Sequence, residues 1–271
     1  MPNALDASAE INTNFLLTGP PGVGKTTQLL TFKGKKFAYF FDPSGVGAVR
    51  GHDVDYEEFL GTKLNVTVSP IPKGGPGLEP RELGDARLKA QAYAQWEEHW
   101  MRSLDDGFFE KYDVVMFDST TTLMDIALDD LLAREGRLKF TPQQGDYNTV
   151  KIQLRNIFRA GCALPCVTIF TGHTMLRQRT DQSKMLNDLL VPGDLQVRGP
   201  LLFGTCGLMT YNYDKSSKLK SYSIQTVQDE FNQNLKSDLS RIRPIQDVTI
   251  SDFKRPEDFG LGKILRDSMP S

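Results

Sequence analysis

The chain has 271 residues, of which 39% are hydrophobic and 24% are charged. This composition supplies enough apolar side chains for a packed core and excludes wholesale disorder. There are 32 lysine and arginine residues against 34 aspartate and glutamate residues, so the net charge of −2 excludes a generally basic nucleic-acid coat, although not a local basic groove. No apolar run reaches the roughly 18 residues of a membrane span, and we expect a cytoplasmic protein with no signal peptide and no membrane partner.

The polar, irregular residues 1–13 predict a flexible leader. Short apolar runs predict strands buried on both faces at 15–18, 37–41, 112–117 and 165–170. Apolar residues at helical spacing predict helices at 25–32, 82–104, 120–134 and 147–161. Between the second strand and the second helix, an alternating run predicts an edge strand at 65–68 and a turn-rich connector at 70–80.

Two further runs, 207–213 and 219–227, predict a C-terminal antiparallel hairpin around the turn Asp214-Lys-Ser-Ser217. Strands that alternate with helices predict an α/β fold in which helices flank a mostly parallel central sheet. We expect a core over 14–227 and a C-terminal extension over 228–271 that packs on the core or is exchanged between copies. Three cysteines lack the partners of a zinc site and are expected to be buried thiols: Cys162, Cys166 and Cys206.

The stretch Gly19-Pro-Pro-Gly-Val-Gly-Lys25-Thr26-Thr27 fits the phosphate-binding pattern G-x-x-x-x-G-K-[ST] between a predicted strand and a predicted helix. The glycines let the backbone curl so that N–H groups point at a phosphate, and the helix adds the positive end of its dipole. We expect Lys25 to reach the β- and γ-phosphates and to face solvent in the empty loop, and Thr26 to ligate Mg²⁺. The residues predicted to bind the nucleotide are Gly19, Pro20, Pro21, Gly22, Val23, Gly24, Lys25, Thr26 and Thr27.

Polar residues follow three of the predicted strands, at the edge where ligands of open α/β folds bind. Asp118 would hold Mg²⁺ opposite Thr26, or it would only cap the next helix. Asp42 could orient the attacking water, with a helix cap as the alternative. His173 could hydrogen-bond the γ-phosphate, with a structural hydrogen bond as the alternative. The predicted catalytic set is therefore Lys25, Asp42, Asp118 and His173.

Three motifs follow one another along the chain: the phosphate loop, Val114-Val-Met-Phe-Asp118-Ser-Thr-Thr-Thr-Leu123, and Ile169-Phe-Thr-Gly-His173 with a basic loop behind it. In this order they resemble the small RecA-like ATPases of bacteriophages, over residues 13–260. The resemblance implies a RecA-like P-loop core that binds ATP and Mg²⁺, hydrolyses ATP, assembles into a ring or filament, and acts on single-stranded DNA in recombination or annealing. It also implies a phage single-strand-binding protein as a partner and the host cytoplasm as the compartment.

The same resemblance implies DNA contacts from the loop 174–199 and from the segment 134–139. The residues concerned are Arg134, Arg137, Lys139, Arg177, Arg179, Lys184 and Arg198. Charge alone does not establish this function, because 174–198 carries four cations against three anions and no interleaved aromatic residue. A solvated loop is the alternative.

One position departs from the RecA-like pattern, in which a catalytic glutamate stands two residues after the aspartate of the second strand. Here that residue is Ser44. Either Asp42 serves instead, or Glu57 or Glu58 reaches the site, or hydrolysis is slow. A late Lys/Arg segment, 235–244, resembles the one whose cations reach a neighbouring subunit's γ-phosphate, and its trans-acting candidates are Lys236 and Arg241.

Two other functions remain open. A nucleotide kinase uses the same phosphate loop, but it would need a lid with clustered arginines, and 174–198 has no dense cluster. A non-catalytic, nucleotide-switched assembly subunit is suggested by Ser44 at the glutamate position.

Overall fold

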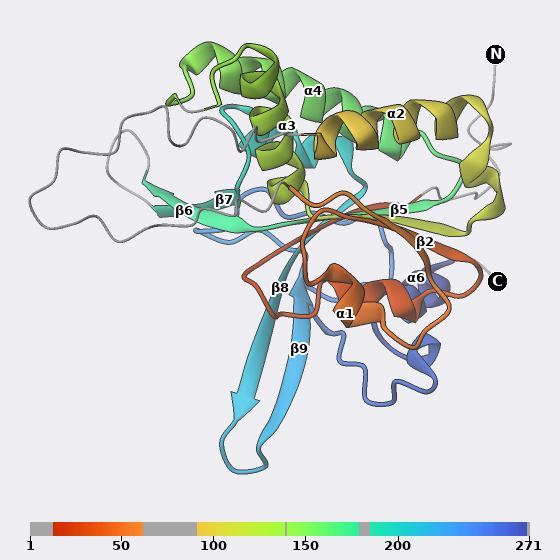
Figure 1. Cartoon of the computed structure of the whole chain (residues 1–271). Coiled ribbons are helices and arrows are strands. Elements are labelled where there is room, and N and C mark those ends of the chain that lie inside the picture. The colour runs from red at the N-terminus through yellow and green to blue at the C-terminus, as the bar shows by residue number, and fades with distance from the viewer. Residues whose placement is uncertain (1–12, 62–90, 139, 179–184, 270–271) are drawn as a thin grey trace, which may run out of the picture.

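The computed structural model describes residues 13–61, 91–138, 140–178 and 185–269. Its centre is an eight-stranded sheet with the order β10-β9-β8-β1-β5-β4-β2-β3 (Figure 1). The strands are β1 (Asn14–Thr18), β2 (Lys36–Phe40), β3 (Asp55–Glu58), β4 (Val114–Asp118), β5 (Val167–Gly172), β8 (Thr205–Asp214), β9 (Leu219–Gln225) and β10 (Ile245–Asp247). Neighbours from β8 to β3 pair in parallel, whereas β8–β9 and β9–β10 pair antiparallel. The predicted α/β architecture and its C-terminal hairpin are thus confirmed.

Helices cover both faces of the sheet (Figure 1). On one face lie α2 (Ala92–Asp105), α3 (Thr120–Arg134) and α4 (Gln144–Cys162). On the other lie the 3₁₀ helix η1 (Thr26–Thr31), α1 (Gly45–Val49) and α6 (Gly260–Ser268). Strands β1, β2 and β4 are buried along their whole length, which explains why each is a continuous apolar run.

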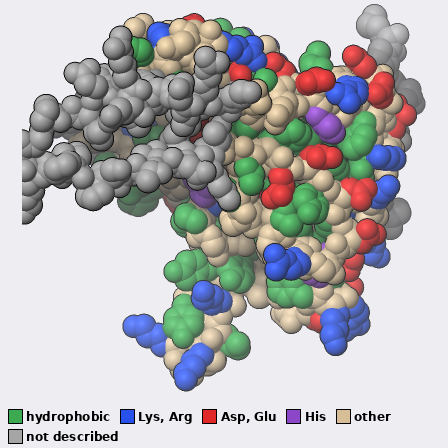
Figure 2. All heavy atoms as spheres, in the orientation of Figure 1, with side chains coloured by type: hydrophobic (Ala, Val, Ile, Leu, Met, Phe, Trp, Pro, Cys, Tyr) green, Lys and Arg blue, Asp and Glu red, His purple; other side chains and the backbone are tan. Residues whose placement is uncertain are grey.

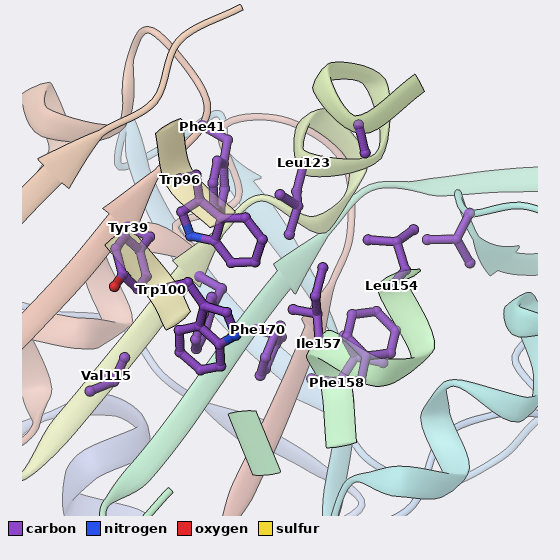
Figure 3. Close-up of a cluster of buried hydrophobic side chains, with 14 of the residues drawn as sticks. Tyr39, Phe41, Trp96, Trp100, Val115, Leu123, Leu154, Ile157, Phe158 and Phe170 are labelled. Carbon is purple, nitrogen blue, oxygen red and sulfur yellow. The ribbon is translucent and has the colours of Figure 1, made fainter. Parts of the chain in front are cut away.

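Aromatic rings fill the core beneath α2, α3 and α4 (Figure 3). The rings of Phe117 on β4 and Phe170 on β5 stack at 4.3 Å between centroids. Trp96 and Trp100 of α2 pack against Tyr39 of β2. These rings pack α2 against the sheet, and the carboxyl ends of the strands carry the candidate site.

Several elements differ from the sequence-based predictions. The helix predicted at 25–32 is a short 3₁₀ helix, with a hydrogen bond from Gln28 N to Lys25 O. Strand β3 was not predicted because its residues, Asp55-Tyr-Glu-Glu58, are all exposed and show no apolar pattern. Residues 1–12, the edge strand at 65–68, the connector at 70–80 and the start of the helix at 82–104 lie outside the described residues.

The segment predicted as a DNA-binding loop, 174–199, contains regular structure instead. Strands β6 (Thr174–Gln178) and β7 (Met185–Leu189) form a separate antiparallel pair, followed by α5 (Leu195–Arg198) and the 3₁₀ helix η3 (Pro200–Leu202). The prediction of an irregular loop was wrong for these described parts. The strands lacked a clear hydrophobic signal, because no residue of β6 is buried and β7 buries the polar Asp188 together with its leucines.

The C-terminal region packs on the sheet and on η1. Strand β10 extends the sheet beside β9, while the 3₁₀ helix η4 (Pro256–Asp258) leads into α6. Leu261, Ile264 and Leu265 of α6 join the core on the η1 side. On the other face of the sheet, the 3₁₀ helix η2 (Phe108–Lys111) precedes β4. Within the described ranges, no helix is both long and apolar enough to cross a membrane.

Candidate nucleotide-binding site

The loop between β1 and η1 has the backbone shape that a phosphate cradle requires. Gly19, Gly22 and Gly24 adopt φ values of +144°, +77° and +81°, a region that residues with a Cβ atom rarely enter. At Gly19 the space is also closed, because a Cβ atom there would lie 2.4 Å from the carbonyl oxygen of Met209 on β8. Glycine is therefore required at this turn by conformation and by packing together.

Lys25 is folded back onto the loop. Its Nζ donates hydrogen bonds to the carbonyl oxygens of Gly19 at 2.8 Å and Pro20 at 2.9 Å, and the residue is only 7% exposed. The expectation that Lys25 faces solvent was wrong, because the loop's own carbonyl groups bind the ammonium group. Burial lowers the pKa of Lys25 to about 8, against the opposing effect of the Asp118 and Asp42 carboxylates.

Asp118, at the carboxyl end of β4, lies directly beside the loop. The Thr26 hydroxyl donates to Asp118 Oδ2 at 2.7 Å, and the Thr171 hydroxyl donates to Oδ1. Asp118 is 4% exposed, and burial raises the pKa of its carboxyl group although both hydroxyls oppose the shift. One hydroxyl and one carboxylate, held in contact at the phosphate loop, form an oxygen donor pair that suits Mg²⁺.

Asp42 reaches the same edge from the end of β2. Its carboxylate accepts a hydrogen bond from the Thr122 hydroxyl of α3, and both Asp42 and Ser44 line the cavity described below. Glu57 and Glu58 lie on the exposed edge strand β3 and are absent from the cavity lining. In the described part of the chain, Asp42 is thus the carboxylate, other than Asp118, that faces the cavity.

His173 follows β5 at the third strand end. Its backbone N–H donates to Thr121 Oγ1 at 3.1 Å, while its ring atom Nδ1 is buried and has no hydrogen-bond partner among the described residues. A buried polar atom without a partner is costly in a protein unless a ligand satisfies it. His173 also lines the cavity, so its side chain lies where a ligand could contact it.

These groups surround one cavity of about 470 Å³. One side consists of the phosphate loop and the strand ends. The C-terminal half contributes four further lining residues, which we call the nucleoside wall: Tyr222, Val248, Ile250 and Phe253. The Tyr222 ring lies beside Gly24, since a Cβ atom there would meet Tyr222 Cδ1 at 3.6 Å. A phosphate-binding loop and an apolar, aromatic wall that line the same cavity match the two parts of a nucleotide.

A family model described as an AAA domain matches residues 11–193. The chain belongs to this AAA domain family. The match covers the phosphate loop and the three strand ends, so the P-loop architecture is a property of the family. The nucleoside wall lies after the matched residues of the AAA domain.

Two further comparisons were made, with curated proteins and with solved structures. No curated protein matches the sequence. Among solved structures, a KaiC-like protein from the hyperthermophilic archaeon Pyrococcus horikoshii OT3 has 12% identity and a TM-score of 0.43, covering 91% of this chain and 87% of that chain. The flagellar accessory protein FlaH from Methanocaldococcus jannaschii has 10% identity and a TM-score of 0.41, covering 89% and 86%.

The cations predicted to contact DNA are already paired at the four positions that the structure describes. Arg177 binds the buried Asp188 at 2.8 Å, Arg198 lies 3.2 Å from Asp194, and Arg134 lies 2.7 Å from Asp130. Arg137 pairs with Glu135 and Asp146. Lys139, Arg179 and Lys184 lie outside the described residues. These positions therefore show little free positive charge, and their DNA role stays a prediction.

The trans-acting candidates lie away from the cavity lining. Lys236 Nζ donates to the carbonyl oxygen of Leu201 at 3.2 Å, and the Lys236 backbone pairs with Cys206 at the start of β8. Arg241 is exposed. Their contact with the γ-phosphate of a neighbouring subunit stays a prediction.

Proposed function

We propose that this AAA domain is a Mg²⁺-dependent ATPase whose nucleotide state controls its binding to single-stranded DNA. The observation that carries the ATPase part is the 2.7 Å contact between the Thr26 hydroxyl and Asp118 across the base of the phosphate loop. When bound, Mg²⁺ would neutralise charge on the β- and γ-phosphate oxygens. Thr26 and Asp118 are the residues that would hold it.

Three other residues, Lys25, Asp42 and His173, have separate roles in the proposed hydrolysis. The Lys25 ammonium exchanges its two backbone carbonyl partners for phosphate oxygens, which accept its protons more strongly because they are charged. Asp42, fixed by Thr122, orients the attacking water. His173 donates a hydrogen bond to the γ-phosphate and connects this contact to the following strand, β6.

The DNA part of the proposal rests on the resemblance to phage RecA-like ATPases. It includes assembly into a ring or filament, single-strand annealing or recombination in the host cytoplasm, and a single-strand-binding protein as a partner. An alternative, a nucleotide-switched assembly subunit with negligible turnover, is favoured by Ser44 at the glutamate position.

The test measures three quantities on one preparation: ATP affinity by calorimetry, steady-state phosphate release, and binding of a fluorescent oligonucleotide at low salt. We expect the wild type to reach full ATP affinity only when Mg²⁺ is present. It should also release phosphate and bind the oligonucleotide. A Lys25→Ala variant should lose ATP affinity, and unchanged affinity would contradict the assignment of the loop. Binding without phosphate release would support the switch instead.

A further inference from the structure

The β8–β9 hairpin projects from the body of the molecule (Figure 1). From Thr210 outward, β8 is exposed, and β9 is exposed from Leu219 to Ser221. An exposed two-stranded hairpin gains little stability from the core, so its side chains need another explanation. Figure 2 shows lysine and hydrophobic side chains gathered on this hairpin.

One face of the hairpin carries an aromatic strip, which we define as Tyr211, Tyr213 and Tyr222. Tyr211 stands directly opposite Tyr222, and Tyr213 stands opposite Lys220. Because side chains alternate along a strand, these residues share the face of the buried Met209. Tyr222 lines the nucleotide cavity, so the strip runs from that cavity towards the tip. Tyr211 is 52% exposed and Tyr213 is 46% exposed.

The tip is locally basic in a chain whose net charge is −2. Lys215, Lys218 and Lys220 stand against one acid, Asp214, which gives a net charge of 3 − 1 = +2. Asp214 accepts hydrogen bonds from the Ser216 and Ser217 hydroxyls. None of these lysines forms an ion pair within the described ranges, and Lys220 Nζ lies 5.7 Å from the centroid of the Tyr211 ring. By contrast, the two arginines that the structure describes in 174–198, Arg177 and Arg198, are paired with aspartates.

We propose that this face of the hairpin binds single-stranded DNA, with bases stacked on Tyr211 and Tyr213 and with phosphates beside the three lysines. The inference deepens the proposed function and rests on it. Exposed aromatic faces beside cations are the combination that single-strand binding requires, and a duplex hides the base faces that would stack. Tyrosine is also common at protein interfaces, but lysine is depleted there, so the three lysines without ion pairs favour a strand of phosphates over a second protein.

The position of Tyr222 gives this surface a physical link to the nucleotide. Tyr222 belongs to the nucleoside wall and pairs with Tyr211 across the hairpin. A bound nucleotide that orders the Tyr222 ring therefore also orders the neighbouring platform. ATP and the strand would then favour one another's binding to the same extent, as linkage requires.

The experiment measures the affinity of a fluorescein-labelled oligothymidylate by anisotropy, with ATP and Mg²⁺ present. The variant Y211V/Y213V removes both rings but keeps residues that favour strands. We expect its affinity to fall by about fivefold or more for each ring removed, whereas Y211F/Y213F stays within about twofold of the wild type. In K215Q/K218Q/K220Q, the slope of log affinity against log salt should decrease by about 0.7 for each lysine.

Matched controls separate this surface from general effects. Phe231→Val removes an exposed ring outside the hairpin, and Lys33→Gln removes an exposed charge on another face; both should bind like the wild type. If the wild type binds the strand and Y211V/Y213V binds equally well, the inference is overturned while the proposed function stands. If the wild type binds ATP but no strand, the DNA part of the proposed function falls with it. Altered sedimentation of Y211V/Y213V with unchanged DNA affinity would make the hairpin a protein contact and also overturn the inference.

Discussion

The Thr26 hydroxyl donates a hydrogen bond of 2.7 Å to the carboxylate of Asp118, although the two residues are 92 positions apart in the sequence. The two meet because β1 and β4 are both parallel strands of one sheet, with β5 between them, and both end at the same edge. Thr171, at the end of β5, holds the other oxygen of the carboxylate. The sheet therefore brings together the Thr26 hydroxyl and the Asp118 carboxylate, the oxygens that we propose would hold Mg²⁺.

Replacing Thr26 by valine should abolish the Mg²⁺ dependence of ATP binding. The substitution keeps the shape of the side chain but removes the hydroxyl that faces Asp118. Mutating a residue that only hydrogen-bonds to a metal ligand typically lowers metal affinity by about 10- to 100-fold. Removing the hydroxyl ligand itself should lower the Mg²⁺ affinity by at least this much. Calorimetric titration with ATP in Mg²⁺ and in EDTA measures it. Thr26→Ser keeps the hydroxyl and should behave like the wild type; equal Mg²⁺ enhancement in the valine variant would remove Thr26 from the metal site.

The sequence predicted this part of the site because its signals are local. A glycine-rich motif and polar residues after apolar runs can be recognised in short windows, and parallel strands bring their ends to one edge. Asp42, Asp118 and His173 all line the cavity as a result. What the sequence missed about Lys25 was its environment, because the hydrogen bonds to Gly19 and Pro20 depend on the folded loop.

The nucleoside wall could not be predicted in this way. Tyr222, Val248, Ile250 and Phe253 come from a strand and from irregular segments without a common motif. Their role depends on how the C-terminal region packs beside the phosphate loop. Strand β3 escaped prediction for a different reason, since an exposed edge strand has no hydrophobic side to reveal it.

Replacing Asp42 by asparagine should lower turnover with little effect on ATP affinity. Asp42 faces the cavity and accepts a hydrogen bond from Thr122, whereas the Thr26 hydroxyl donates to Asp118. Loss of a group that assists proton transfer typically slows a reaction by about 10²- to 10⁴-fold. Steady-state phosphate release and calorimetry separate the two effects.

Asp125 provides the matched control for Asp42. Desolvation, followed by the Asp129 and Asp42 carboxylates, raises the pKa of Asp125 to about 6, so this group senses the charge of Asp42. It does not line the cavity. Asp125→Asn should therefore retain turnover. Equal losses in both variants would show that the local charge matters, not the position of Asp42.

Replacing Tyr222 by alanine should weaken ATP binding with or without Mg²⁺. The ring stands beside Gly24 in the cavity wall, where a base can stack on it. Stacking on an aromatic side chain contributes about 1–3 kcal/mol, which corresponds to a loss of about 5- to 150-fold. Tyr222→Phe retains the ring and should bind normally. Inorganic tripolyphosphate lacks a base, and its affinity should be the same for all three proteins; a parallel loss would place Tyr222 at the phosphates instead.

The Gln28 side chain joins the first turn after the phosphate loop to the C-terminal region. Its Nε2 donates to the carbonyl oxygen of Val248 at 3.0 Å, and its Oε1 accepts from the backbone N–H of Leu261 at 2.9 Å. Gln28 is 2% exposed, so its loss leaves two backbone groups buried without partners. One of them, Val248, belongs to the nucleoside wall.

Gln28→Ala should therefore lower the free energy of unfolding by about 2–6 kcal/mol, since each of the two unsatisfied buried groups costs about 1–3 kcal/mol. Urea unfolding measures the loss. Gln28→Met fills the same space without polar atoms and should recover only the part due to the cavity, whereas the exposed Gln233→Ala should change stability by less than about 0.5 kcal/mol. If the methionine variant is as stable as the wild type, the two hydrogen bonds do not hold the C-terminal region. Because Gln28 and Val248 both line the nucleotide cavity, the alanine variant should also have reduced ATP affinity.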